Sequence, residues 1–114
     1  MDTNTFNKIV DKRLNECVSV LCQKADEYAT EDRLHNFKSA ASLMGCTPIW
    51  ALGGMMVKHT ISVYDLIRDH EIGLDISRKM WAEKIGDSIN YLLLLTALIE
   101  EEKRLEAENE KCDY

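Results

Sequence analysis

The sequence has few of the residues that interrupt regular structure, with one proline and five glycines among its 114 residues. Strand-rich proteins need turn residues between short alternating segments, and no such pattern is present. The four cysteines have neither C-x-x-C spacing nor histidines at zinc-finger distances, which argues against a structural zinc site: Cys17, Cys22, Cys46 and Cys112. We therefore expect an all-α protein whose thiols stay free in a reducing cytosol.

Long hydrophobic runs and basic clusters are also lacking. The apolar stretch YLLLLTALI, residues 91–99, is far shorter than the ~20 residues that a membrane-spanning helix needs. The N-terminal sequence MDTNTFNKIV lacks the basic segment and apolar run of a signal peptide, and no basic stripe for duplex nucleic acid is visible. These absences predict a cytoplasmic protein that binds neither a membrane nor duplex nucleic acid.

The negative charge is concentrated at the C-terminal end. The chain has a net charge of -6, and residues 100–114 hold seven acidic and three basic residues. The other 99 residues are nearly balanced, with 13 acids and 11 bases, so they could still form a local positive pocket. We expect one helical domain over residues 1–99, followed by a charged helical extension or tail over residues 100–114.

Four segments carry apolar residues at intervals of three to four positions, which predicts four helices. We expect the first helix to be capped by Thr3 or Asn4 and to run to about Tyr28. The other three should run from about Leu34 to Met44, from Pro48 to about Asp69, and from about Ser77 into the charged tail. Gly45 is typical of a helix C-terminus, and Thr47 before Pro48 is typical of a helix start. The chain is therefore predicted to form a four-helix bundle.

The spacing also predicts which side of each helix faces the core. The expected inward residues are Phe6, Val10, Leu14, Val18, Leu21, Ala25 and Tyr28; Leu34, Phe37, Ala41 and Leu43 or Met44; Ile49, Leu52, Met56, His59, Val63, Leu66 and Ile67; and Trp81, Ile85, Ile89, Leu92, Thr96 and Ile99. Residues 91–99 are apolar on every side of their helix, so a subunit interface is expected there. The bundle is therefore expected to be completed by homo-oligomerisation.

Two adjacent glycines, Gly53 and Gly54, lie inside the predicted third helix. Each lowers helix stability by about 1 kcal/mol relative to alanine. Either another helix packs closely against them, or a ligand needs the space that a side chain would fill.

The segment EYATEDRLHNFK, residues 27–38, joins two apolar helical patterns without the glycine, serine or proline expected of a connector. We interpret it as the polar wall of a nucleotide pocket that the third and fourth helices close. The candidate ligand-binding residues are Arg33, His35, Asn36, Lys38, Gly54, Lys58, His59 and Asp87. Tyr28 and Phe37 are either core residues or a stacking platform for a base.

Ordinary structural roles remain open for the same residues. Lys58 could be a surface lysine, and His59 could be a core or interface histidine on the apolar side of its helix. Asp87 could accept hydrogen bonds from Arg33 or His35 and hold the polar segment in place.

Part of the fourth helix, WAEKIGDSINYLLLL at residues 81–95, resembles the MazG-type all-α nucleoside triphosphate pyrophosphatases. A wider resemblance, covering residues 17–102, is to small phage proteins named for a nucleotide modification associated domain. The sequences EYATEDRLHNF, GMMVKH and EKIGDSINYLLLL carry it, in that order. The two resemblances imply a MazG-like helical bundle and a phage-type protein.

In the MazG-type family, carboxylates from two helices hold Mg²⁺ ions that bridge the triphosphate. The resemblance places Asp87 at one of these carboxylates. Lys84 stands three residues earlier, where the family has a glutamate, and Glu83 is the residue before it. On the third helix, Lys58 and His59 stand where further carboxylates are expected, and Asp65 is the nearest acid. A lysine in place of a carboxylate repels a metal and attracts a phosphate, so we expect the fold without the reaction.

These features predict a non-catalytic, phage-type nucleotide-binding protein that needs no cofactor. Its expected role is to sequester a nucleotide, in the form of a cyclic nucleotide signal of host anti-phage defence, in the host cytoplasm. One alternative is a divergent Mg²⁺-dependent nucleoside triphosphate pyrophosphatase with Asp65, Glu83 and Asp87 as metal ligands. A second alternative is a structural helical module that binds a partner protein.

Overall fold

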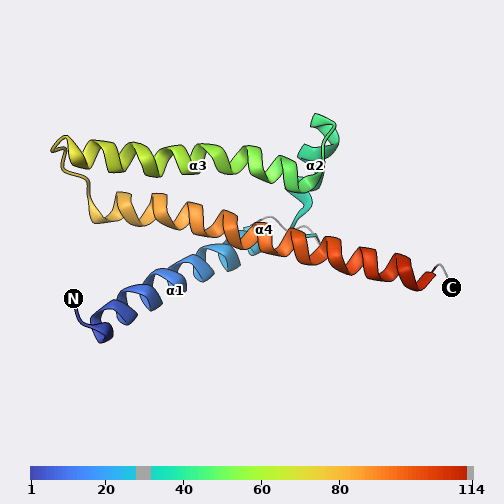
Figure 1. The fold of residues 1–114 in the computed structure, drawn as a ribbon, viewed down its shortest axis with the longest axis horizontal. Coiled ribbons are helices and arrows are strands. Elements are labelled where there is room, and N and C mark those ends of the chain that lie inside the picture. Colours follow the sequence, from blue (N-terminus) through green and yellow to red (C-terminus); the bar gives the residue numbers. More distant parts are fainter. Residues whose placement is uncertain (28–31, 113–114) are drawn as a thin grey trace.

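The computed structural model describes residues 1–27 and 32–112, without the side chains of residues 24–27 and 112. Within these ranges it contains four α-helices and no strand, so the predicted all-α class is confirmed. The helices are α1 (Thr3–Glu27), α2 (His35–Met44), α3 (Pro48–Glu71) and α4 (Arg78–Cys112) (Figure 1). The predicted inward positions Ala25 and Tyr28 lie outside the described side chains.

The start of α1 differs from the prediction. The backbone N–H of Thr5 donates a hydrogen bond of 2.7 Å to the carboxylate of Asp2, so Asp2 caps the helix in place of Thr3 or Asn4. This hydrogen bond lowers the pKa of Asp2 below its ordinary value. The charged carboxylate also lies at the positive end of the helix dipole, which favours it there.

The corner between α2 and α3 forms as the sequence predicts. Gly45 ends α2 with a φ of 67°, in the left-handed region that glycine adopts without strain. Thr47 then accepts a hydrogen bond of 3.2 Å from a backbone N–H in the first turn of α3, where Pro48 stands. Ser77 caps α4 in the same way, accepting from the N–H of Met80 at 3.0 Å.

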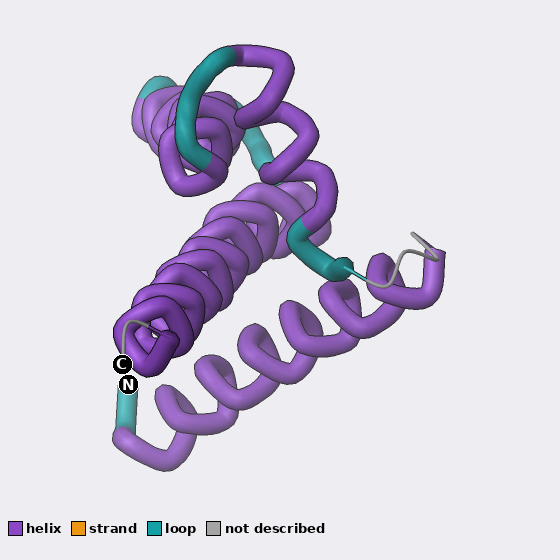
Figure 2. The backbone as a smooth tube through the Cα atoms, turned by 90° about the vertical axis from the view of Figure 1, so that its right-hand side faces the viewer, coloured by secondary structure: helices purple, strands orange, loops and turns teal. Residues whose placement is uncertain are grey.

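α4 is the central helix of an open arrangement. α3 runs antiparallel along one side of it, α1 packs on another side, and α2 packs against α3 (Figures 1 and 2). α1 crosses α4 where Cys17 meets Gly86 and diverges from it toward the N-terminus. The chain has a Cα radius of gyration of 17.7 Å, against roughly 13 Å for a compact domain of this length. One copy therefore does not form a closed four-helix bundle.

The core lies where α2 and α3 meet the middle of α4. Its buried members are Leu34, Phe37, Leu52 and Leu98, and Leu52 is fully buried. Partly buried residues packed against it include Ile49, Met55, Met56, Tyr91, Leu94 and Leu95. The predicted inward positions Leu34, Phe37, Ala41 and Leu52 are therefore confirmed.

The predicted core stripe of α4 is wrong in its C-terminal half. Leu92 is 54% exposed and Ile99 is 41% exposed, while Tyr91, Leu94 and Leu98 face the core instead. At the start of the stripe, Trp81 is partly buried and its ring lies 6.1 Å from that of His70 on α3. This part of α4 is apolar on all sides, so the sequence period does not select one face. Leu43, Met44 and Ile67, which were also predicted to point inward, are exposed as well.

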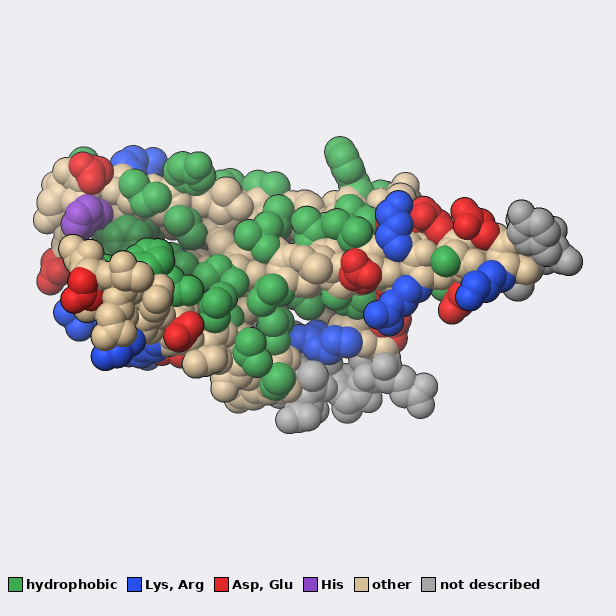
Figure 3. Space-filling view, turned by 60° about the horizontal axis from the view of Figure 1, so that its bottom comes forward, with side chains coloured by type: hydrophobic (Ala, Val, Ile, Leu, Met, Phe, Trp, Pro, Cys, Tyr) green, Lys and Arg blue, Asp and Glu red, His purple; other side chains and the backbone are tan. Residues whose placement is uncertain are grey.

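α1 also leaves its predicted stripe uncovered. Phe6, Val10, Leu14 and Val18 are exposed, and among the described side chains of this helix the buried one is Cys17, at the crossing with α4. The reason is that α1 diverges from α4, so its N-terminal half meets no other helix in the described part of the chain. Apolar side chains therefore remain on the surface, and many gather over the middle of the face shown in Figure 3.

The thiol of Cys17 is free, as are those of Cys22 and Cys46. Burial raises the pKa of Cys17, so this thiol stays protonated near neutral pH and is a poor nucleophile. Its place at the helix crossing gives it a packing role.

Of the two expected reasons for the paired glycines, close packing by another helix is not met within one copy. A Cβ atom built at Gly53 or Gly54 would meet no heavy atom of a neighbouring described element within 4 Å. The space beside them is open, so the alternative that a ligand needs this space stays a prediction.

In the part of the chain that the structure describes, no single helix has the length and apolar character to cross a membrane. The pair α2 and α3, bent by 99° at their junction, meets those criteria when taken together.

The buried core predicts a large effect for one leucine and a small effect for another. Leu52→Ala should lower the free energy of unfolding by about 2–5 kcal/mol, because it leaves a cavity around a fully buried side chain. Leu43→Ala is the matched control, since Leu43 is 89% exposed, and should change stability by about 0.5 kcal/mol or less. Urea unfolding followed by circular dichroism measures both, and equal losses would contradict the assigned core.

Candidate functional site

A hollow of about 600 Å³ lies between α2, α3 and α4, and we call it the central hollow. Five of the eight predicted ligand-binding residues line it: Arg33, Asn36, Lys58, His59 and Asp87. They come from the segment before α2 and from three different helices, so only the tertiary fold brings them together. The volume falls in the range of roughly 300–1,000 Å³ that small-molecule sites occupy.

The lining of the central hollow combines positive charge with aromatic surface. Among the lining residues that the structure describes, two cations, Arg33 and Lys58, share it with one carboxylate, Asp87, although the whole chain has a net charge of -6. Phe37 and Tyr91 line it as well, and their rings meet edge to face with centroids 6.2 Å apart. Such a lining suits an anion that also carries a flat ring.

His59 connects α3 to α4 inside the central hollow. Its Nδ1 lies 3.6 Å from the Asp87 carboxylate, which is long for a hydrogen bond but short enough for an ion pair when the imidazole is protonated. Its ring lies over that of Tyr91, with centroids 4.5 Å apart and planes tilted by 36°. The His59 side chain is 17% exposed, so it packs partly in the core and still borders the hollow.

Lys58 and Asn36 have uncommitted polar groups. Neither side chain forms a hydrogen bond or an ion pair with any residue in the ranges 1–27 and 32–112. Arg33 is placed by its guanidinium, whose Nη2 donates to the carbonyl of Leu21 at 3.4 Å. The ammonium of Lys58 can therefore meet an anion without first breaking an internal ion pair.

Asn90 is a site residue that the sequence analysis missed. It is 8% exposed and borders the central hollow, and its Oδ1 is buried without a hydrogen-bond partner among the described residues. An unpaired buried amide oxygen costs about 1–3 kcal/mol. The one signal in the sequence is an asparagine directly before the apolar run of α4.

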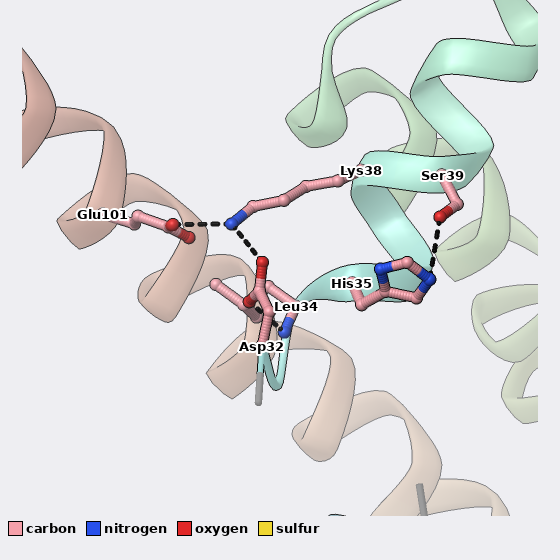
Figure 4. A network of polar contacts seen from close by, with 6 residues as sticks. All are labelled: Asp32, Leu34, His35, Lys38, Ser39 and Glu101. Atoms are coloured by element: carbon pink, nitrogen blue, oxygen red, sulfur yellow. Dashed lines mark hydrogen bonds and ion pairs between the residues drawn. The ribbon is translucent and has the colours of Figure 1, made fainter. Parts of the chain in front are cut away.

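The three other predicted ligand-binding residues lie elsewhere. Lys38 reaches from α2 toward α4 and bonds to Asp32 at 2.5 Å and to Glu101 at 2.6 Å, while the His35 ring contacts Ser39 at 3.2 Å (Figure 4). Gly54 is exposed and does not border the central hollow. Lys38 is instead a structural cation that ties the start of α2 to α4.

A second hollow, of about 470 Å³, lies between the start of α3 and the C-terminal half of α4. Its charged lining consists of Lys38 and three glutamates, Glu101, Glu102 and Glu106. Because Lys38 is already paired with Glu101, this hollow is negative and disfavours a phosphate.

The metal ligands of the enzyme alternative do not converge. Glu83 and Asp87 border a hollow between α1 and α4, whereas Asp65 pairs with Arg68 on α3 at 3.2 Å. Across the described parts of the chain, no group of three or more His, Cys, Asp or Glu side chains is placed to hold a metal ion. The described residues of one copy therefore do not form the two-metal site that the MazG-type resemblance implies.

Comparisons with known proteins place the chain in no family, because no family model, no curated protein and no solved structure matches it. The resemblances to MazG-type pyrophosphatases and to small phage proteins therefore remain expectations.

The ion pairs of Lys38 predict a pH-dependent contribution to stability. The pKa of Asp32 is lowered chiefly by the hydrogen bond from Lys38 and to a smaller extent by the hydrogen bond from the Leu34 N–H. The pKa of Lys38 is raised by its hydrogen bonds to Asp32 and Glu101. A lowered carboxyl pKa stabilises the fold above the unfolded value of about 3.9, and this stabilisation is lost as the pH falls through the folded value.

Asp32→Asn should therefore destabilise the protein at pH 7 by no more than about 1 kcal/mol, since the Asp32 side chain is 42% exposed. The difference from the unmodified chain should shrink as the pH falls below the unfolded value of about 3.9, and should vanish once the carboxyl of the folded state, whose pKa is lowered, is protonated as well. Urea unfolding across a series of pH values measures this, with Glu106→Gln as a control in a same-helix surface pair. A difference that persists at low pH would contradict the assigned ion pair.

Proposed function

We propose that the protein binds a nucleotide in the central hollow and sequesters it without chemical conversion. The observation that supports this is the convergence of Arg33, Lys58 and His59 beside the aromatic rings of Phe37 and Tyr91. The cations suit the phosphate, and the aromatic surface suits the base. The amide of Asn90, which borders the hollow, adds a polar side chain near the site of a base.

The charge of the lining favours a ligand with few phosphate charges. Two cations and one carboxylate offset only a small negative charge, whereas a triphosphate carries several charges and is normally bound together with Mg²⁺. Each phosphodiester of a cyclic nucleotide carries a single charge. A cyclic nucleotide is therefore the ligand class that this hollow suits best.

The resemblance of residues 17–102 to small phage proteins supplies the biological form of the proposal, which is capture of a cyclic nucleotide signal of host anti-phage defence. Capture requires binding without turnover. Lys58 and His59, which stand where the pyrophosphatases are expected to carry carboxylates, support binding over hydrolysis.

The two alternative functions, a pyrophosphatase and a structural module, would use different residues of the protein. A divergent pyrophosphatase would need Asp65, Glu83 and Asp87 to meet around Mg²⁺, either after rearrangement or across copies. A structural module would use the exposed apolar faces of the helices and would leave the central hollow without a ligand.

Nucleotide binding should depend on Lys58. Lys58→Ala should weaken the binding of a cyclic nucleotide by about 1–3 kcal/mol, the range for a hydrogen bond to a charged group, and rising salt should weaken it further. Calorimetric titration with mono-, tri- and cyclic nucleotides measures both effects. Lys103→Ala is the matched control, because Lys103 pairs with Glu106 on the charged end of α4. Equal affinities for the two variants would move the phosphate site elsewhere.

Bound nucleotide should be recovered intact. With Mg²⁺ or Mn²⁺ present, the protein should release no pyrophosphate from any common nucleoside triphosphate, because a second divalent ion needs several carboxylates around it. Mass spectrometry after denaturation identifies the ligand, and a pyrophosphate assay measures turnover. Metal-dependent turnover that Asp87→Asn abolishes would overturn capture and restore the enzyme alternative.

A further inference from the structure

We propose that a second copy of this chain packs antiparallel against the outer stripe of α4, which we define as Trp81, Ile85, Ile89, Leu92, Thr96 and Ile99. This proposal does not rest on nucleotide binding. Ile85, Leu92 and Ile99 are 37%, 54% and 41% exposed, although five of the six stripe residues are apolar. α1 and α3 pack mainly on other sides of α4, and α3 meets the start of the stripe where the rings of Trp81 and His70 lie 6.1 Å apart.

The exposed area of the chain supports a second copy as the occupant. The accessible surface is 8872 Å², against roughly 6,400 Å² for a compact monomer of 13.1 kDa. The excess, about 2,500 Å², exceeds the roughly 800 Å² that each partner of a standard stable interface buries. This excess surface is large enough to be buried in one interface on α4 together with further contacts by the exposed half of α1.

The spacing of the stripe suits a two-fold axis. Its residues span 18 positions, or about 27 Å of helix, and lie almost symmetrically about residue 90. In an antiparallel pair, Trp81 faces Ile99 of the partner copy. Ile85 then faces Thr96, and Ile89 faces Leu92, each within one residue of exact register. A self-complementary patch of this kind is what a symmetric dimer requires.

The charges at the two ends of the stripe select the antiparallel direction. α4 begins with Arg78 and Lys79, and the stripe is followed by the acidic run at residues 100–102. Antiparallel packing brings the basic start of one copy beside the acidic run of the other, and it also opposes the two helix dipoles. Parallel packing would place like charges together.

The outer face of α3 is the main competing surface. It exposes Trp50, Val57, Ile61 and Tyr64 beside the open space at Gly54. A substitution on this face therefore serves as the comparator for one on α4. Leu92 and Ile61 are 54% and 53% exposed, so an aspartate at either position perturbs a single chain to a similar extent.

Light scattering coupled to size exclusion, at micromolar concentration, tests the surface. The unmodified chain should have at least twice the monomer mass of 13.1 kDa, Leu92→Asp should reduce it to the monomer mass, and Ile61→Asp should leave it unchanged. Circular dichroism checks that each variant keeps its helices. A monomeric unmodified chain, or dissociation by Ile61→Asp alone, would overturn the proposal.

Charge reversal tests the direction and does not alter the apolar stripe. Arg78→Glu or Glu100→Arg should each raise the dimer dissociation constant about threefold to tenfold, the range for two exposed ion pairs. The double variant should restore it, because the two positions are about 33 Å apart within one helix and can pair only between copies. Single reversals without effect, or a double variant weaker than both, would overturn the antiparallel arrangement.

Discussion

The packing of α4 against α3 around Leu52 is the constraint on which the rest of the structure depends. Leu52 is fully buried, and the residues of α4 that contribute to its cluster are Tyr91, Leu94, Leu95 and Leu98. This contact fixes the rotation of α4 about its own axis. The same rotation turns Asp87 and Tyr91 toward the central hollow and leaves Leu92 on the outside. The candidate site and the proposed interface are thus two consequences of one packing choice.

Charge is distributed in the structure more sharply than the net value of -6 indicates. The acids of the C-terminal half of α4 border their own hollow, where Lys38 is held by Asp32 and Glu101. Among its described lining residues, the central hollow holds Lys58 and Arg33 with one carboxylate, Asp87. Separating the charges in this way gives an acidic protein a candidate site for an anion, where short-range contacts would dominate over the screened field of the tail.

The proposed binding and the proposed assembly use different surfaces of the same helix. The central hollow uses the side of α4 that faces α2 and α3, whereas the outer stripe lies on another side and meets α3 at its start, where Trp81 contacts His70. A substitution at Leu92 therefore leaves the lining of the hollow unchanged, and one at Lys58 leaves the outer stripe unchanged. An oligomer that captures nucleotides would accordingly contain several equivalent hollows, each formed by the residues of one copy alone.

The sequence by itself determined the helices and most of their ends, because caps such as Thr47 and Gly45 act within a few residues. It also identified five residues of the central hollow by their chemistry. It could not orient α4, because residues 91–99 are apolar on every side of the helix, nor could it reveal that Lys38 pairs with Asp32 and Glu101 or that the Asn90 oxygen is buried without a partner among the described residues. Those outcomes were decided by tertiary structure, because they depend on contacts between segments that are far apart in the sequence. Hydrophobic periodicity reports on one helix at a time and contains no information about such contacts.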